Sequence, residues 1–198
     1  MHFLKEHSDS IVKLYINQIG VAIFSIFLYT AAGSFNDDGT SSLTVKLLIS
    51  AFATIFYFVL IYNVAWEIGA KDKIRIEGGR MTEEKLKGIR LGFYANTPNF
   101  AIVGLAFILF SIYMISGAEG LKSIFAILNL IFRLFISMYL GIIQGLTSGI
   151  SENVDLSYLI QTLLYLVFSA IAMLITHISY KLGLKDIRLL PASKPNRE

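Results

Sequence analysis

The stretch LLISAFATIFYFVLIYNVAW, residues 47–66, carries no charged side chain and lies between Lys46 and Glu67. A helix needs roughly 20 apolar residues to cross the hydrocarbon core of a bilayer, which is about 30 Å thick. A water-soluble domain of this chain's size has too little interior to cover such a helix on every side. The stretch therefore predicts a membrane-spanning helix.

Three other segments have the length and composition of a membrane span: residues 14–35, 91–118 and 156–180. The whole chain agrees, because 55% of its 198 residues are hydrophobic and only 16% are charged, against about 25% charged in an average soluble domain. The first span could be mistaken for a cleaved signal peptide, but Glu6 and Asp9 precede it and its apolar run is too long. We expect an all-α, polytopic transmembrane helix bundle that forms one domain over residues 1–198.

The chain contains no cysteine, which excludes disulfides, thiolate metal sites and a cysteine nucleophile. The three histidines, His2, His7 and His177, are too scattered to suggest a metal centre. We expect no metal and no cofactor. The net charge of +3 is small and gives no reason to expect nucleic-acid binding.

Residues 123–149, SIFAILNLIFRLFISMYLGIIQGLTSG, form a fifth apolar segment that is interrupted by Arg133 and loosened by Gly141, Gly145 and Gly149. The segment is too short for two full spans. It either crosses the membrane once or enters and leaves on the same side as a broken, re-entrant pair of half-helices.

The distribution of lysine and arginine favours the re-entrant interpretation. Such residues concentrate on the cytoplasmic side of membrane proteins, and seven lie in the loop 67–90 and five in the tail 181–198. A re-entrant segment places 14 of the 17 basic residues inside, whereas a single crossing leaves only nine there. We therefore expect four full spans plus a broken segment, with both termini in the cytoplasm and external segments at 36–42 and 151–155. We expect the protein to reside in a cell membrane, the bacterial cytoplasmic membrane.

Two similar stretches follow the second and the last spans: GAKDKIR at 69–75 and GLKDIR at 183–188. Glycine just after a helix often caps it, and a lysine there suits the negative helix end. We expect both stretches to be cytoplasmic helix stops, with an internal duplication as the alternative.

The stretches WEIGAKDKIR at 66–75 and MYLGIIQG at 138–145 resemble parts of small multi-pass membrane proteins of Gram-positive bacteria. This resemblance implies a membrane protein and brings no activity with it.

The candidate ligand site combines Arg133 with the polar break Asn96-Thr97-Pro98-Asn99 in the third span. Proline removes a backbone donor, and an ionisable group inside the membrane is a functional candidate. We expect Arg133, Asn96 and Asn99 to face one polar cavity and to contact a ligand there. Snorkelling of the arginine and a simple helix kink are the alternatives.

The basic residues Lys71, Lys73 and Arg75 mark a candidate interaction surface in the charged loop. They could bind a membrane or cytoplasmic protein partner, or the loop could be a connector that rests on anionic headgroups.

The chain shows no catalytic motif of intramembrane proteases or phosphatidyltransferases, and we expect it not to be an enzyme. The favoured function is a small transporter, channel or permease subunit that handles a small, anionic ligand. The alternative is a non-catalytic interaction, immunity or regulatory subunit. In either case the lipid bilayer is the first partner.

Overall fold

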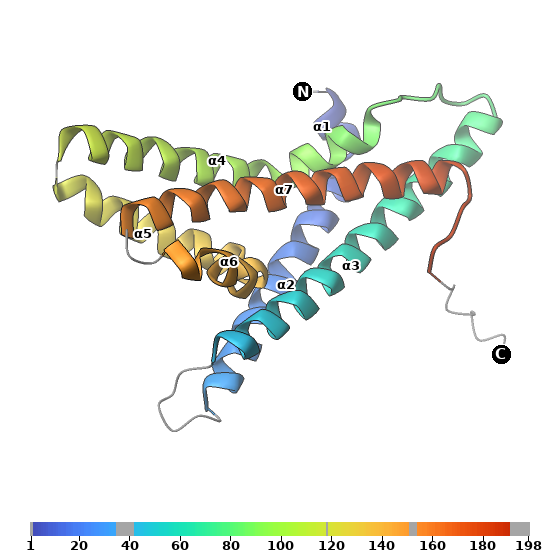
Figure 1. Cartoon of the computed structure of the whole chain (residues 1–198). Coiled ribbons are helices and arrows are strands. Elements are labelled where there is room, and N and C mark those ends of the chain that lie inside the picture. The colour runs from blue at the N-terminus through green and yellow to red at the C-terminus, as the bar shows by residue number, and fades with distance from the viewer. Residues whose placement is uncertain (1, 35–41, 118, 151–153, 191–198) are drawn as a thin grey trace.

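The computed structural model describes residues 2–34, 42–117, 119–150 and 154–190, and every regular element in these ranges is a helix (Figure 1). After the short α1 (His2–Glu6), the long helices are α2 (Ser8–Ser34), α3 (Leu43–Glu77), α4 (Lys87–Ser116) and α7 (Val154–Leu184). Each of the four contains a stretch long and apolar enough to cross a membrane. The predicted all-α bundle with four spans is confirmed, and the chain is a multi-pass integral membrane protein.

The segment between the third and fourth spans is broken into short helices. These are α5 (Glu119–Phe135), the 3₁₀ turn η1 (Ser137–Tyr139), α6 (Leu140–Thr147) and the 3₁₀ turn η2 (Ser148–Ile150). The η1 turn lies deep in the bundle, because Ser137 Oγ donates to the Ala22 carbonyl at 2.6 Å and Thr54 Oγ1 donates to the Met138 carbonyl at 3.3 Å. Since α7 starts at the end of the molecule where α4 stops (Figure 1), α5 and α6 form a broken hairpin, the shape expected of the re-entrant interpretation.

The third span is one continuous helix, although the sequence led us to expect an interruption at Pro98. The polar side chains beside the proline bond within the preceding turn. Asn96 Nδ2 donates to the Gly92 carbonyl at 2.9 Å, and Thr97 Oγ1 donates to the Phe93 carbonyl at 3.0 Å. These bonds satisfy the polar side chains within α4, and the helix is continuous across the proline.

The helix α3 runs to Glu77, well past the predicted end of its span at Trp66. Gly69 therefore lies inside the helix, and the prediction that it caps the helix is wrong. Gly69 and Gly183 instead face each other where α3 crosses α7. A Cβ atom on Gly69 would overlap the Tyr180 carbonyl, and one on Gly183 would overlap the Trp66 carbonyl. The two similar stretches thus share a packing role, because each supplies the glycine that lets the other backbone approach.

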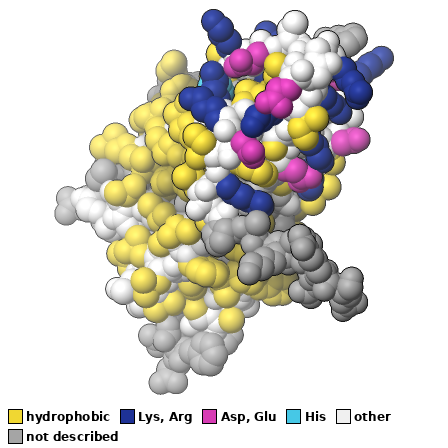
Figure 2. All heavy atoms as spheres, turned by 90° about the vertical axis from the view of Figure 1, so that its right-hand side faces the viewer, with side chains coloured by type: hydrophobic (Ala, Val, Ile, Leu, Met, Phe, Trp, Pro, Cys, Tyr) yellow, Lys and Arg dark blue, Asp and Glu magenta, His cyan; other side chains and the backbone are white. Residues whose placement is uncertain are grey.

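Charged residues gather at one end of the molecule, which we call the charged end. It is formed by α1, the segment between α3 and α4, and the last turns of α3 and α7 (Figure 1). Figure 2 looks onto this end and shows lysine and arginine side chains mixed with aspartate and glutamate. From here the α2–α3 pair and the α4–α7 pair diverge toward the far end, with α5 and α6 between them (Figure 1).

The predicted external segments 36–42 and 151–155 fall largely outside the described residues, as do positions 191–198 of the predicted tail. Their described neighbours agree with the expected arrangement. The end of α2 and the starts of α3 and α7 lie at the far end, whereas the ends of α3 and α7 lie at the charged end (Figure 1).

Candidate functional site

Arg133 lies in the last turn of α5, just before the break at η1. Its Nη2 donates to Gln161 Oε1 of α7 at 3.3 Å, and its guanidinium carbon lies 6.0 Å from the centre of the Tyr158 ring. Its Nε is buried and has no hydrogen-bond partner in the described part of the chain. No ion pair among the described residues includes Arg133. The permanently charged guanidinium therefore has no countercharge in these ranges.

A pocket of about 320 Å³ opens beside Arg133 between α2, α3, α5 and α6. We call it the two-cation pocket, because Lys46 near the start of α3 also lines it. No carboxylate belongs to its lining among the residues that the structure describes, and its volume reaches the lower end of the range of small-molecule sites, about 300–1,000 Å³. The other lining residues are Ile26, Tyr29, Thr30, Leu130, Leu134, Ser137, Leu140 and Gln144.

A glycine brings the hairpin and Lys46 together. Gly141, in the first turn of α6, packs so closely on α3 that a Cβ atom there would overlap the Lys46 carbonyl. Its backbone N–H donates to Ser50 Oγ at 2.7 Å and to the Tyr29 hydroxyl at 3.1 Å, and these two hydroxyls also hydrogen-bond each other. The absence of a side chain at Gly141 thus fixes the broken segment against the start of α3, where the pocket forms.

Asn96 and Asn99 lie in a different buried cluster, which we call the amide network. Gln18 Nε2 donates to Asn99 Oδ1 at 2.9 Å, and Asn99 Nδ2 donates to Asn96 Oδ1 at 3.2 Å. The Tyr57 hydroxyl donates to Gln18 Oε1 at 3.4 Å, so the network joins α2, α3 and α4. Neither asparagine lines the two-cation pocket. The structure brings the two predicted asparagines together and places Arg133 in a separate site, because the two amides bond to Gln18 of α2 and to groups within α4.

The predicted interaction surface lies on the last part of α3, at the charged end. Its basic residues have acidic partners within the chain, with N–O distances of 2.7 Å for Lys71–Glu67, 3.7 Å for Lys73–Asp186 and 3.8 Å for Arg75–Asp72. The side chains of Lys71 and Arg75 remain well exposed. The surface is therefore accessible, but the chain itself neutralises much of its charge.

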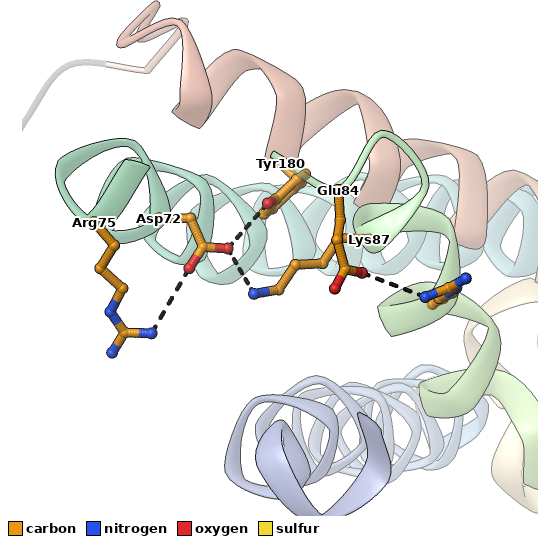
Figure 3. Close-up of polar contacts among 6 residues, drawn as sticks. Asp72, Arg75, Glu84, Lys87 and Tyr180 are labelled. Atoms are coloured by element: carbon orange, nitrogen blue, oxygen red, sulfur yellow. Dashed lines mark hydrogen bonds and ion pairs between the residues drawn. The ribbon is translucent and has the colours of Figure 1, made fainter. Parts of the chain in front are cut away.

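Sequence reasoning missed a buried ion pair at the same end. Lys87 Nζ lies 2.8 Å from Asp72 Oδ2, and both side chains are almost completely buried. The Tyr180 hydroxyl donates to the same carboxylate oxygen at 2.9 Å (Figure 3). We call this the Asp72–Lys87 clip, because it ties α3, α4 and α7 together. Both charged residues lie in a hydrophilic stretch of sequence, which gave no sign of their burial.

Lys46 was also missed as a site residue, although one signal points to it. It is one of three basic residues, with Lys122 and Arg133, that the re-entrant topology leaves off the cytoplasmic side. A cation at such a position opposes the general charge bias of membrane proteins, which is a reason to look for a ligand there.

The described ranges contain no group of three or more histidine, aspartate or glutamate residues that could hold a metal ion. No protein-family model, curated protein or solved structure matches the chain. The function is therefore argued from the geometry of the bundle and its pocket.

Proposed function

We propose that the protein is a small transporter, channel or permease subunit that binds an anionic ligand between Lys46 and Arg133. The observation that carries this proposal is that two cations line one pocket, and that no carboxylate is among the described residues of its lining. A guanidinium can hold a carboxylate or a phosphate with two parallel hydrogen bonds, and an ammonium adds a compact charge. Since an arginine inside the hydrocarbon costs at least about 2.5 kcal/mol on insertion scales, an anion would offset that cost.

The position of the pocket supports a role in transport. It lies where α5 breaks and α6 begins, inside a re-entrant hairpin. Discontinuous helices of this kind form the substrate sites of many transporters, because their free helix ends supply polar groups at membrane depth. We expect the chain to bind and move its ligand without chemical change.

Thermal unfolding of the purified protein in a nonionic detergent tests the anion site. A ligand that binds only the folded state at 100 times its Kd adds about 2.7 kcal/mol of stability. We expect at least one anionic probe, phosphate, a carboxylate or an alkyl phosphate, to raise the unfolding midpoint. Arg133→Gln and Lys46→Gln should remove this increase. Arg90→Gln, which deletes a positive charge near the start of α4 and away from the pocket, should keep it. A protein that no anion stabilises would contradict the proposal.

We infer that the membrane is the bacterial cytoplasmic membrane and that the charged end faces the cytoplasm, because the basic residues concentrate there. The cysteine-free chain allows a direct test with single cysteines at exposed positions. In intact cells an impermeant thiol reagent should label Ser148→Cys, at the far end, and spare Thr82→Cys. The reverse pattern would invert the orientation.

An interaction subunit is the second candidate, favoured by the exposure of Lys71 and Arg75 at the charged end. The triple variant Lys71→Gln, Lys73→Gln, Arg75→Gln should then lose a protein partner that the wild-type chain retains during purification. Identical co-purifying proteins in both samples would leave this surface with no partner role.

A further inference from the structure

The two-cation pocket has a substantial apolar side. Ile26, Leu130, Leu134 and Leu140 line it together with the two cations. A small hydrophilic anion would pair with Lys46 and Arg133 but would leave these aliphatic side chains uncovered. A ligand that also carries an alkyl chain would cover them.

The pocket opens between α2 and α5. The lining side chains that are exposed, Thr30, Leu130 and Leu134, all belong to these two helices. The lining residues from α3, η1 and α6 are buried or only partly exposed. The mouth of the pocket is therefore on the side of the bundle where α2 and α5 meet.

The surface around this mouth is strongly apolar. Ile23 and Phe27 of α2, and Ile127 and Ile131 of α5, are exposed large side chains next to it. In a protein whose helices cross the bilayer, such a surface faces lipid tails. A dissolved anion has no polar route along it, whereas a molecule already in the bilayer reaches the mouth by lateral diffusion.

The two cations that line the pocket are available to a headgroup. Among the described residues, the guanidinium of Arg133 has the Gln161 amide as its one hydrogen-bond partner, and its buried Nε has none. Lys46 lies near the start of α3, toward the far end, and Arg133 lies deeper, at the helix break. An anionic group between them would supply the missing acceptor and the missing countercharge.

We propose that the ligand is an anionic amphiphile, a lipid or lipid-like molecule with a phosphate or carboxylate headgroup, which enters from the bilayer between α2 and α5. Its anion binds between Lys46 and Arg133, and its alkyl chain lies against Leu130 and Leu134. This inference rests on the proposed function, because it names the ligand class of the same pocket.

The test compares three probes on the full chain in nonionic micelles: dodecyl phosphate, dodecylphosphocholine and inorganic phosphate. Dodecyl phosphate should raise the unfolding midpoint by several degrees. Dodecylphosphocholine, which has the same chain but no net charge, should leave it almost unchanged. Inorganic phosphate should also have little effect, even in large molar excess, because it lacks the chain.

Variants separate the two halves of the recognition. Arg133→Gln should weaken the apparent affinity for dodecyl phosphate roughly tenfold or more, as expected for lost charge-assisted hydrogen bonds, and Arg90→Gln should not. The double variant Leu130→Ala, Leu134→Ala keeps both cations, and its apparent affinity for dodecyl phosphate should be several-fold weaker than that of the wild type. If Arg133→Gln fails to fold, Arg133→Lys keeps the charge without the planar fork and should bind more weakly than the wild type.

Each outcome bears on one claim. Equal stabilisation by inorganic phosphate and by dodecyl phosphate would overturn the amphiphile and leave the anion site standing. Equal stabilisation by dodecyl phosphate and dodecylphosphocholine would show that the chain alone is recognised, which overturns this inference. No response to any anionic probe would overturn both this inference and the proposed function.

Discussion

Two sites within the bundle, the Asp72–Lys87 clip and the two-cation pocket, differ in how their charge is balanced. At the Asp72–Lys87 clip an ammonium meets a carboxylate at 2.8 Å, and Tyr180 donates to the same oxygen (Figure 3). At the two-cation pocket Arg133 donates to the Gln161 amide, Lys46 lines the same pocket, and the described lining residues include no carboxylate. A buried charge with its countercharge holds helices together, whereas a charge without one is available to a ligand.

Removing the countercharge at the clip should have the largest effect on stability. Asp72→Asn leaves the buried ammonium of Lys87 without a carboxylate, and breaking such a pair costs about 3–5 kcal/mol. Unfolding of the detergent-solubilised protein measures the loss. Adding Lys87→Met to this variant should recover much of it, because the remaining charge is then gone.

The repeated sequence offers a matched control for this prediction. Asp186 occupies the position in GLKDIR that Asp72 occupies in GAKDKIR, but it is exposed and its pair with Lys73 is 3.7 Å long. Asp186→Asn should therefore cost no more than about 1 kcal/mol. Equal losses in Asp72→Asn and Asp186→Asn would show that the clip does not hold the three helices.

Two glycine substitutions should have an intermediate effect and separate the two places. Gly69→Ala at the α3–α7 crossing and Gly141→Ala at the hairpin each push a methyl group into a backbone carbonyl, and overpacking typically costs about 1–3 kcal/mol. Only Gly141→Ala should also abolish stabilisation by an anion, because it displaces α6 from Lys46. Gly20→Ala, which meets nothing within 4 Å, serves as the control. Loss of the anion response in Gly69→Ala as well would argue against a local pocket.

The smallest effect concerns pH at the charged end. Burial, followed by the positive charge of Lys87, lowers the pKa of His7 below its ordinary value of 6.5, while Glu6, Asp72 and Glu84 act in the opposite direction. The unfolded chain then binds the proton more readily than the folded chain. The contribution of His7 to the free energy of unfolding should be complete above about pH 6.5, and the free energy of unfolding should decrease as the pH falls below this value.

Unfolding midpoints measured across this range in the wild type and in His7→Gln test the assignment. The variant should show a flatter dependence on pH. An unchanged slope would assign the pH dependence to another group.

The sequence predicted the spans well because bilayer thickness sets their length, whatever the helices pack against. The break in the fifth segment was predictable from Arg133 and the glycines that follow it, while the distribution of basic residues favours an even number of crossings after the central loop. The extension of α3 to Glu77 was missed because its charges were taken for a loop. The pairs Glu67–Lys71 and Lys73–Glu77 have the i,i+4 spacing of a helix and could have revealed it.

The site was only partly predictable. Arg133 stands out as a charged residue in an apolar stretch of sequence. The second cation of the pocket, Lys46, could not be predicted, because its place there depends on how α6 packs on α3 and no local sequence pattern encodes that packing. Likewise, Asn96 and Asn99 were recognised as polar residues in a span, while their partner Gln18 lies in another helix. Sequence identifies the unusual side chain, and tertiary packing decides which residues surround it.

The glycine crossing of α3 and α7 has a mechanical consequence for the pocket. The two helices touch backbone to backbone at Gly69 and Gly183, while the α2–α3 and α4–α7 pairs diverge toward the far end (Figure 1). The crossing is thus a fulcrum, and Lys46 lies on an arm of roughly 35 Å from it at 1.5 Å per residue. A tilt of α3 by one degree about this point moves Lys46 by about 0.6 Å on that arm. A change of packing at Gly69 and Gly183 would thus be enlarged at Lys46, unless the contact of Gly141 with α3 holds the pocket in place.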